Sequence, residues 1–246
     1  MTGTWINITA VIVSSLLGTF LGNRLPDKMR ETVVHGLGLM TSVVGMQMAL
    51  GTSNVLLLMG SILVGGIVGE WWRIEDGLEA MGRWLESHVT VRVDPRGGVI
   101  AGRTGERSIT RAFVTASLVF CVGPMTVVGS IQDGLTGDYN LLAIKSVLDG
   151  FAALAFAASM GPGVILSVLT ILVFQGGLSL AAMGFGDLLG EVTRQTPWVI
   201  EMTAAGGVLM LAISLLLFEL RKIRVANLLP AIFIAPLAQV ILDRLG

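Results

Sequence analysis

The chain has 246 residues, of which 53% are hydrophobic and only 13% charged, and its formal net charge is −1. A soluble domain has about 25% charged residues, so this composition excludes an ordinary soluble protein. The nearly neutral charge indicates no nucleic-acid partner, and the single cysteine, Cys121, excludes an internal disulfide. The apolar residues fall in long blocks without the alternation of transmembrane β-strands, so we expect membrane-spanning helices.

We predict an all-α fold, a polytopic transmembrane helical bundle of about eight spans that forms a single domain over residues 1–246. The first block lacks the basic residues that precede the apolar core of a signal peptide, so we expect it to remain as a span. The predicted spans are Trp5–Gly22, Thr32–Gly51, Asn54–Trp72, Arg111–Ile131, Asn140–Ser159, Pro162–Met183, Trp198–Leu220 and Val225–Leu242.

The first three spans contain two glycine patterns and one histidine of interest. Gly18-x-x-x-Gly22 and Gly65-x-x-x-Gly69 are small-residue patterns that allow close packing of helices in a membrane. His35 lies inside the second span, where its ordinary pKa would suit a proton relay. A histidine that only packs near the interface is the alternative.

The segment 74–110 separates the third and fourth spans. Ile74–His88 repeats apolar residues at helical spacing and has a charged opposite face, which predicts an amphipathic helix. It would lie on the cytoplasmic membrane interface or pack against a partner subunit. Arg92–Ser108 is rich in glycine and arginine and is predicted to be a loop.

The basic residues predict the orientation of the chain. With the N-terminus outside, thirteen Lys and Arg residues fall in cytoplasmic loops, and only Arg194 and Arg244 fall outside. This asymmetry follows the positive-inside rule and supports an even number of spans. We therefore expect both termini to be extracytoplasmic.

The fourth span contains Gly123-Pro124. Proline removes a backbone donor and glycine relaxes the backbone, so a carbonyl one turn earlier loses its partner. One interpretation is a kinked packing helix, and the other is a broken helix that offers carbonyls to an ion or substrate.

Gln132 and Asp133 follow within the polar segment Gln132–Asp138. The aspartates of this segment suit turns and caps or, alternatively, ion coordination.

The fifth span carries a potential ion pair. Lys145 and Asp149 are four residues apart and therefore on one helix face. A lone charge near the middle of a bilayer costs about 2.5–3.5 kcal/mol, and pairing offsets part of that cost. The pair is either structural or part of ion coupling. The full set of candidate site residues is Gly123, Pro124, Gln132, Asp133, Lys145, Asp149, Gln175 and His35.

A weak internal similarity links His35-Gly36 through Gly65-Gly66 with Asp149-Gly150 through Gly176-Gly177. If spans one to three match spans four to six, the odd number inverts the second copy, as in many transporters. Chance similarity between apolar segments is the alternative.

The chain resembles the YqgA/YdfK-like family of bacterial inner-membrane proteins of unknown function. The similarity rests on these segments: Gly22–Pro26, Gly36–Leu39, Ala116–Met125, Gln132–Asp138, Lys145–Gly150, Phe174–Gly176 and Arg224–Pro230. The resemblance implies a multi-span protein of the bacterial plasma membrane and suggests transport. It implies no known substrate or catalytic residue.

The polar groups within the spans predict a secondary transporter or channel-like permease for an ion or small polar solute. The chain has no ATP-binding loop, so transport would be passive or driven by a gradient. A scaffold or sensor with structural polar groups is the main alternative, and a lipid-modifying enzyme is a weaker one, since the sequence carries no complete catalytic motif. We expect no enzyme activity and no cofactor, membrane lipid as a partner, and glycine-rich faces that permit a homo-oligomer.

Overall fold

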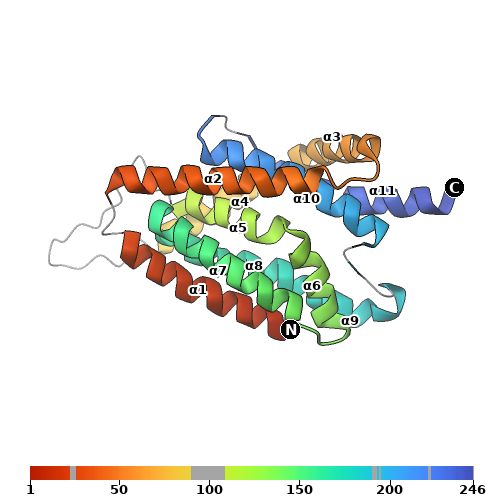
Figure 1. Ribbon diagram of the computed structural model, residues 1–246, viewed down its shortest axis with the longest axis horizontal. Helices are drawn as coiled ribbons and strands as arrows, with labels where there is room; N and C mark the ends of the chain where they lie inside the picture. Colours follow the sequence, from red (N-terminus) through yellow and green to blue (C-terminus); the bar gives the residue numbers. More distant parts are fainter. Residues whose placement is uncertain (23–25, 90–108, 190–192, 194, 221–222, 246) are drawn as a thin grey trace.

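The computed structural model describes the chain except for residues 23–25, 90–108, 190–192, 194, 221–222 and 246 (Figure 1). Within the described part, seven helices are long and apolar enough to cross a membrane, or eight when a bent pair is counted as one span. The bent pair is the predicted fourth span. The prediction of an all-α membrane protein with about eight spans is therefore confirmed.

Each predicted span coincides with one helix or with consecutive helical segments. Two segments are 3-10 helices, η1 (Pro162–Leu166) and η3 (Val225–Leu228), and one is a π-helix, η2 (Leu172–Gly176). The α-helices are α1 (Thr2–Gly22), α2 (Asp27–Ala49), α3 (Val55–Trp72), α4 (Ile74–Val89), α5 (Ile109–Val122), α6 (Pro124–Leu135), α7 (Asn140–Met160), α8 (Ser167–Ile171), α9 (Gly177–Leu189), α10 (Pro197–Leu217) and α11 (Ala231–Leu245).

The bundle contains two sets of helices, and the buried helix α10 contacts members of both. One set, α2, α3 and α11, contacts α10 directly, and α3 also packs along α11. In the other set, α1 lies alongside α7, and α6 packs against α9 (Figure 1). Large apolar side chains such as Leu56, Ile67 and Phe151 point outward, whereas Asn7 and Glu201 are fully buried. This distribution suits a lipid surround, because lipid offers no partner to a polar group.

Glycines bring the paired helices together. A Cβ atom added at Gly18 or Gly22 of α1 would lie 2.2 or 2.3 Å from a carbonyl oxygen of α7. A Cβ at Gly69 of α3 would lie 1.9 Å from the carbonyl oxygen of Asn227. The packing role predicted for both glycine patterns is therefore confirmed, since only glycine permits backbones to approach this closely.

The predicted amphipathic helix is α4. Its residues Ile74 and Leu78 pack against the apolar core of the same chain, and Gly82 approaches Phe113 of α5. Part of the apolar face is thus covered by the chain itself, while Met81 stays exposed. The predicted Gly/Arg-rich loop, residues 92–108, lies outside the described residues.

Side chains at the α3–α4 junction fix this helix. Asn227 of η3 accepts a hydrogen bond from the backbone N–H of Glu75 at 2.7 Å and donates to Glu70 at 2.6 Å. Glu75 in turn accepts from the N–H of Ala226 at 2.8 Å, and Arg224 pairs with Glu70. Burial, as the larger effect, raises the pKa of Glu75, although the hydrogen bond from Ala226 and the charge of Arg224 act in the opposite direction.

The inverted repeat is not confirmed. His35 is exposed on α2 and contacts the ring of Phe218, whereas its proposed counterpart Asp149 is buried. Likewise, no atom outside the local backbone lies within 4 Å of a Cβ added at Gly36, whereas a Cβ at Gly150 would meet Ser14 at 3.1 Å. The two Xaa-Gly pairs therefore occupy different surroundings.

The close approach at Gly18 predicts a strong response to one methyl group. Gly18→Ala forces α1 away from α7, because its Cβ would overlap the carbonyl of Leu154, and should cost about 1–3 kcal/mol. The control Gly36→Ala adds its methyl to open space and should leave stability unchanged or higher, since alanine favours helix by up to about 1 kcal/mol. Thermal unfolding of both purified variants in detergent measures the difference. Equal midpoints would contradict the prediction.

The raised pKa of Glu75 predicts a pH dependence of stability. A proton binds more tightly to Glu75 in the folded protein than in the unfolded chain, where the pKa is near the ordinary value of 4.5. The resulting stabilisation is complete below pH 4.5 and is lost as the pH rises through the higher folded pKa. The unfolding free energy of the wild type relative to Glu75→Gln should thus fall from acidic to neutral pH. Thermal melts across this range test the sign, and a rising difference would refute it.

Candidate functional site

The predicted ion pair between Lys145 and Asp149 is present and buried. Both residues lie on the face of α7 that turns inward, and the Lys145 ammonium group donates to Oδ2 of Asp149. Their side chains are only 5% and 12% exposed. Asp149 is nine residues from the start of the 21-residue helix α7, which places it about 14 Å along a helix about 31 Å long. The pair therefore lies near the middle of the span.

Side chains from two other spans complete the polar group around this pair. Asn7 of α1 donates through Nδ2 to Oδ2 of Asp149 and to Oε1 of Gln175, both at 3.0 Å. Gln175 donates through Nε2 to Oγ1 of Thr4 at 3.2 Å. We call these five residues, Thr4, Asn7, Lys145, Asp149 and Gln175, the central cluster. Its hydrogen bonds join α1, α7 and the sixth span.

The backbone around Gln175 is irregular. The sixth span begins as the 3-10 helix η1, continues as α8, and changes to the π-helix η2 before α9. Gln175 belongs to the π-helical segment and is fully buried. Short π-helical segments occur frequently at functional sites, because the extra residue per turn alters the direction of a side chain. This segment places the Gln175 amide between Thr4 and Asn7.

The fourth span is broken and not merely kinked. Gly123 is extended, with φ −70° and ψ 146°, and the axes of Ile109–Val122 and Met125–Leu135 differ by 62°. The carbonyl of Phe120 would need a donor at position 124, which Pro124 lacks, and it instead accepts from the hydroxyl of Thr126 at 3.0 Å. The Phe120 carbonyl is thus satisfied within the protein. The alternative in which the broken helix offers its carbonyls to an ion or substrate therefore does not hold for this carbonyl.

The break lies close to the central cluster. Phe120 of α5, three residues before Gly123, packs against Phe156 of α7, with their ring centroids 6.4 Å apart. α6 also packs against α7 after the break. The break therefore lies between two segments, α5 and α6, that both contact the helix that carries the ion pair.

The polar segment at the end of α6 has two structural roles. Asp133 is buried and accepts hydrogen bonds from the N–H of Gly3 at 3.1 Å and the amino group of Met1 at 3.2 Å. It thereby holds the start of α1 against α6. Gln132 is half-buried in α6. Asp138 is exposed and accepts from the N–H of Asn140 at 3.0 Å, in an Asx turn just before α7.

Two other polar residues lie elsewhere. His35 contacts the ring of Phe218, and no hydrogen bond among the described residues joins it to the central cluster. Glu201 of α10 is fully buried and accepts from the hydroxyl of Thr52 at 2.6 Å and the N–H of Ser53 at 2.7 Å. It anchors the turn between α2 and α3.

Sequence reasoning did not identify Thr4 and Asn7 as site residues. The signal was present, because helical spacing places them on one face of the first span with Ser15, Gly18 and Gly22, all of which are buried. A face of small and polar residues in a membrane span predicts burial. The identity of the partner helix, however, follows only from the packing of α1 along α7.

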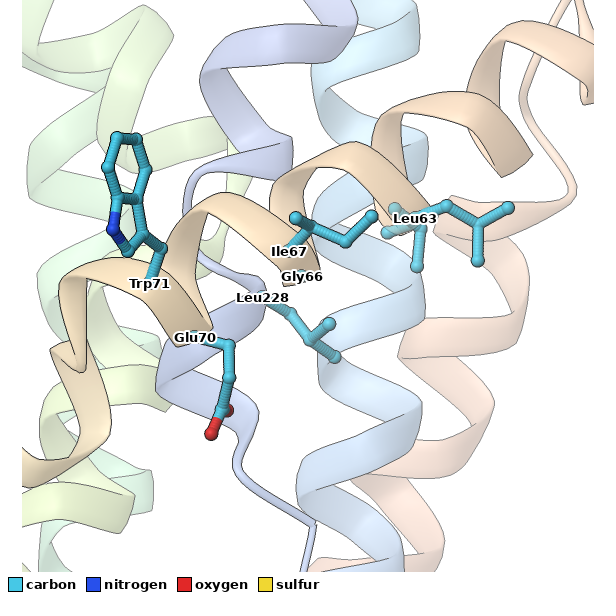
Figure 2. Close-up of a pocket in the computed structure, with 7 residues that line it drawn as sticks. Leu63, Gly66, Ile67, Glu70, Trp71 and Leu228 are labelled. Atoms are coloured by element: carbon cyan, nitrogen blue, oxygen red, sulfur yellow. The ribbon is translucent and has the colours of Figure 1, made fainter.

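An apolar groove of about 530 Å³ lies apart from the central cluster, on the outward face of α3 (Figure 2). Its polar group, Glu70, is already bonded to Arg224 and Asn227. The groove has the character of a lipid-facing surface and supplies no polar site. The lining residues labelled in Figure 2 are Leu63, Gly66, Ile67, Glu70, Trp71 and Leu228.

The buried pair predicts an asymmetry between single and double variants. Asp149→Asn keeps an acceptor oxygen for Asn7 but leaves the Lys145 charge unpaired, which should cost about 3–5 kcal/mol. Adding Lys145→Met removes the unpaired charge and should recover most of the loss. Thermal unfolding of the wild type and both variants measures this. A double variant no more stable than Asp149→Asn would contradict the prediction.

Comparison with known proteins agrees with a whole-chain relationship. A family model described as "Protein of unknown function (DUF554)" matches residues 2–240. The chain is 29% identical over 234 residues to "Uncharacterized protein YqgA" of Escherichia coli (strain K12), which covers 95% of this chain and 94% of that protein.

A second relative is "Uncharacterized membrane protein YdfK" of Bacillus subtilis (strain 168), 23% identical over 250 residues, with 100% of this chain and 99% of that protein covered. No solved structure matches the chain. The resemblance to YqgA and YdfK deduced from the sequence motifs is thereby confirmed. Because the family model extends over nearly the whole chain, the protein belongs to the family of proteins of unknown function DUF554.

Proposed function

We propose that this protein is a secondary transporter or channel-like permease for an ion or small polar solute, with its site at the central cluster. The observation that carries the proposal is the buried Lys145–Asp149 pair, which two other spans complete through Asn7 and Gln175. Ionisable residues inside membrane spans are costly and typically mark ion or substrate pathways.

The irregular spans on either side support this proposal. The fourth span breaks at Gly123 close to the pair, and the sixth is π-helical at Gln175. Transporters commonly bind their substrates near the midplane where helices are discontinuous, because such segments can move without separating whole helices. The break at Gly123-Pro124 is the proposed hinge.

Each charged or amide residue of the central cluster has its own role in binding. Asp149 supplies negative charge and Lys145 supplies the compensating positive charge. The Asn7 amide donates to the carboxylate and is itself held by Gln175. With the pair formed, the cluster is neutral and nearly closed to solvent. A solute that separates Lys145 from Asp149 would exchange protein hydrogen bonds for its own, which allows binding at a modest energetic cost.

The proposed location is the bacterial inner membrane, with both termini extracytoplasmic. The name of the relative YdfK supports a membrane location, and the excess of basic residues in alternate loops supports the orientation. Asp133, which holds the start of α1, would then lie near the extracytoplasmic end of the bundle. Solutes from that side would meet α1 and α6 before the central cluster.

A structural role for the same residues is the second candidate. It is favoured by the capture of the Phe120 carbonyl by Thr126, which leaves that part of the break without an open acceptor. A scaffold or sensor would use the ion pair only to specify how α1 and α7 pack. This candidate predicts that water does not reach the central cluster.

Cysteine accessibility distinguishes the two. In a Cys121→Ala background, Ser146→Cys and Ala153→Cys place thiols at buried positions of α7 on either side of Asp149. A transporter that alternates between open states should allow a water-soluble, impermeant thiol reagent to modify both in membrane vesicles, each from its own side.

The matched control is Val147→Cys, which lies on the same helix but points outward and is 59% exposed to the surroundings of the bundle. Lipid should protect this thiol. Protection of Ser146→Cys and Ala153→Cys to the same extent as Val147→Cys would overturn transport and favour the structural role.

A further inference from the structure

One buried oxygen in the central cluster lacks a partner. Asn7 is fully buried, and both hydrogen bonds of its Nδ2 end on acceptors, Asp149 Oδ2 and Gln175 Oε1. These acceptors determine the orientation of the amide, since exchanging its nitrogen and oxygen would turn oxygen toward oxygen. The remaining atom, Oδ1, is buried without a hydrogen-bond partner among the described residues. An unsatisfied buried acceptor costs about 1–3 kcal/mol, so a function for it is worth seeking.

The surroundings of this oxygen are rich in other oxygens. Asp149 uses Oδ2 for both of its hydrogen bonds, and Gln175 Oε1 and Thr4 Oγ1 belong to the same connected group. Four oxygen-bearing side chains from α1, α7 and the π-helical segment thus meet in one buried place. Hard cations prefer carboxylate, amide carbonyl and hydroxyl oxygens as ligands.

The charge balance selects the type of ion. The central cluster contains one carboxylate, and no group of three or more His, Cys, Asp or Glu side chains that could hold a metal occurs among the described residues. With the Lys145 ammonium group counted, a divalent ion would leave two positive charges uncompensated in the membrane interior and a monovalent ion only one, and each such charge is costly. A monovalent cation matches the single carboxylate.

An anion fits less well. To bind one, Lys145 would have to release Asp149 and leave the carboxylate beside the anion. The unpaired atom is also an acceptor, which repels negative charge. The same atom attracts a cation.

We infer that the central cluster binds an alkali-metal cation through Asp149 and Asn7 Oδ1, and that the Lys145 ammonium group is a tethered competitor for the same carboxylate. This inference rests on the proposed transport function and names the ion class at its site. When the cation enters, Lys145 leaves Asp149, and when the cation leaves, Lys145 returns. The cluster thereby keeps one positive charge opposite Asp149 in both states.

The test is direct binding of radioactive sodium and potassium to the full-length protein in lipid nanodiscs, at constant ionic strength maintained with choline. The wild type should bind at least one of the two ions. Lys145→Met removes the competitor and should tighten binding about tenfold, equivalent to about 1.4 kcal/mol. Asp149→Asn and Asn7→Leu should abolish or strongly weaken it.

Ser15→Ala is the matched control. Ser15 lies on the same helix as Asn7, is fully buried and also has an unpartnered oxygen, but it is outside the central cluster. Its variant should bind as the wild type does. Thermal unfolding gives a second measurement if a variant yields little protein: the bound ion should raise the midpoint of Lys145→Met more than that of the wild type.

The opposite effects of the two charge variants make the inference falsifiable. If Lys145→Met weakens binding as Asp149→Asn does, Lys145 is not a competitor. If neither the wild type nor Lys145→Met binds sodium or potassium, the cluster is not an alkali-cation site. In that case, labelling of Ser146→Cys and Ala153→Cys by the thiol reagent would still support transport of another solute. Protection of both thiols from the reagent would refute transport itself.

Discussion

A charged pair in the interior of a membrane protein is tolerated only if the protein supplies what water would otherwise provide. Here Lys145 and Asp149 compensate each other, and Asn7 adds a hydrogen bond from a neighbouring helix. That bond requires α1 and α7 to lie unusually close. Gly18 and Gly22 create the approach, because each faces the α7 backbone at a distance no other residue would permit. The polar centre and the glycine packing therefore depend on each other.

The irregular backbone follows from the same requirement. A uniform α-helix in the sixth span would direct side chains at regular intervals, and the π-helical segment changes that direction where Gln175 meets Asn7 and Thr4. The break in the fourth span removes one backbone hydrogen bond, which Thr126 replaces at Phe120. Both irregularities are thus tolerated because nearby side chains or packing compensate for them. These two irregular segments support the transport function that we propose from the buried Lys145–Asp149 pair.

Polar residues outside the central cluster have a different purpose. Glu201 fixes the turn between α2 and α3, Asp133 fixes the start of α1, and Asn227 with Glu75 fixes the entry to α4. Each binds backbone N–H groups near the end of a helix, where such groups have no partner within the helix. The buried carboxylates and side-chain amides of the described residues therefore either anchor helix ends or belong to the central cluster.

The sequence by itself determined the class of fold, the eight spans, the amphipathic helix and the Lys145–Asp149 pair. These properties depend on local patterns: apolar blocks of bilayer length, helical periodicity, and a four-residue spacing that brings two side chains to one face. Gln175 and Asp133 were also identified, because a polar group inside or beside a span is conspicuous. Their partners were not, and neither was Asn7.

Only the tertiary structure decided which helices meet. It separated His35 from the ion pair, brought Asn7 to Asp149 across 142 residues of sequence, and joined Gln175 to Asn7 and Thr4 through a π-helical turn. It also showed that Gly123-Pro124 breaks the fourth span while Thr126 satisfies the carbonyl left behind. The physical reason is that apolar spans carry little information about their neighbours. Close packing at particular glycines and a few interhelical hydrogen bonds select the arrangement, and these act only when the chain is folded.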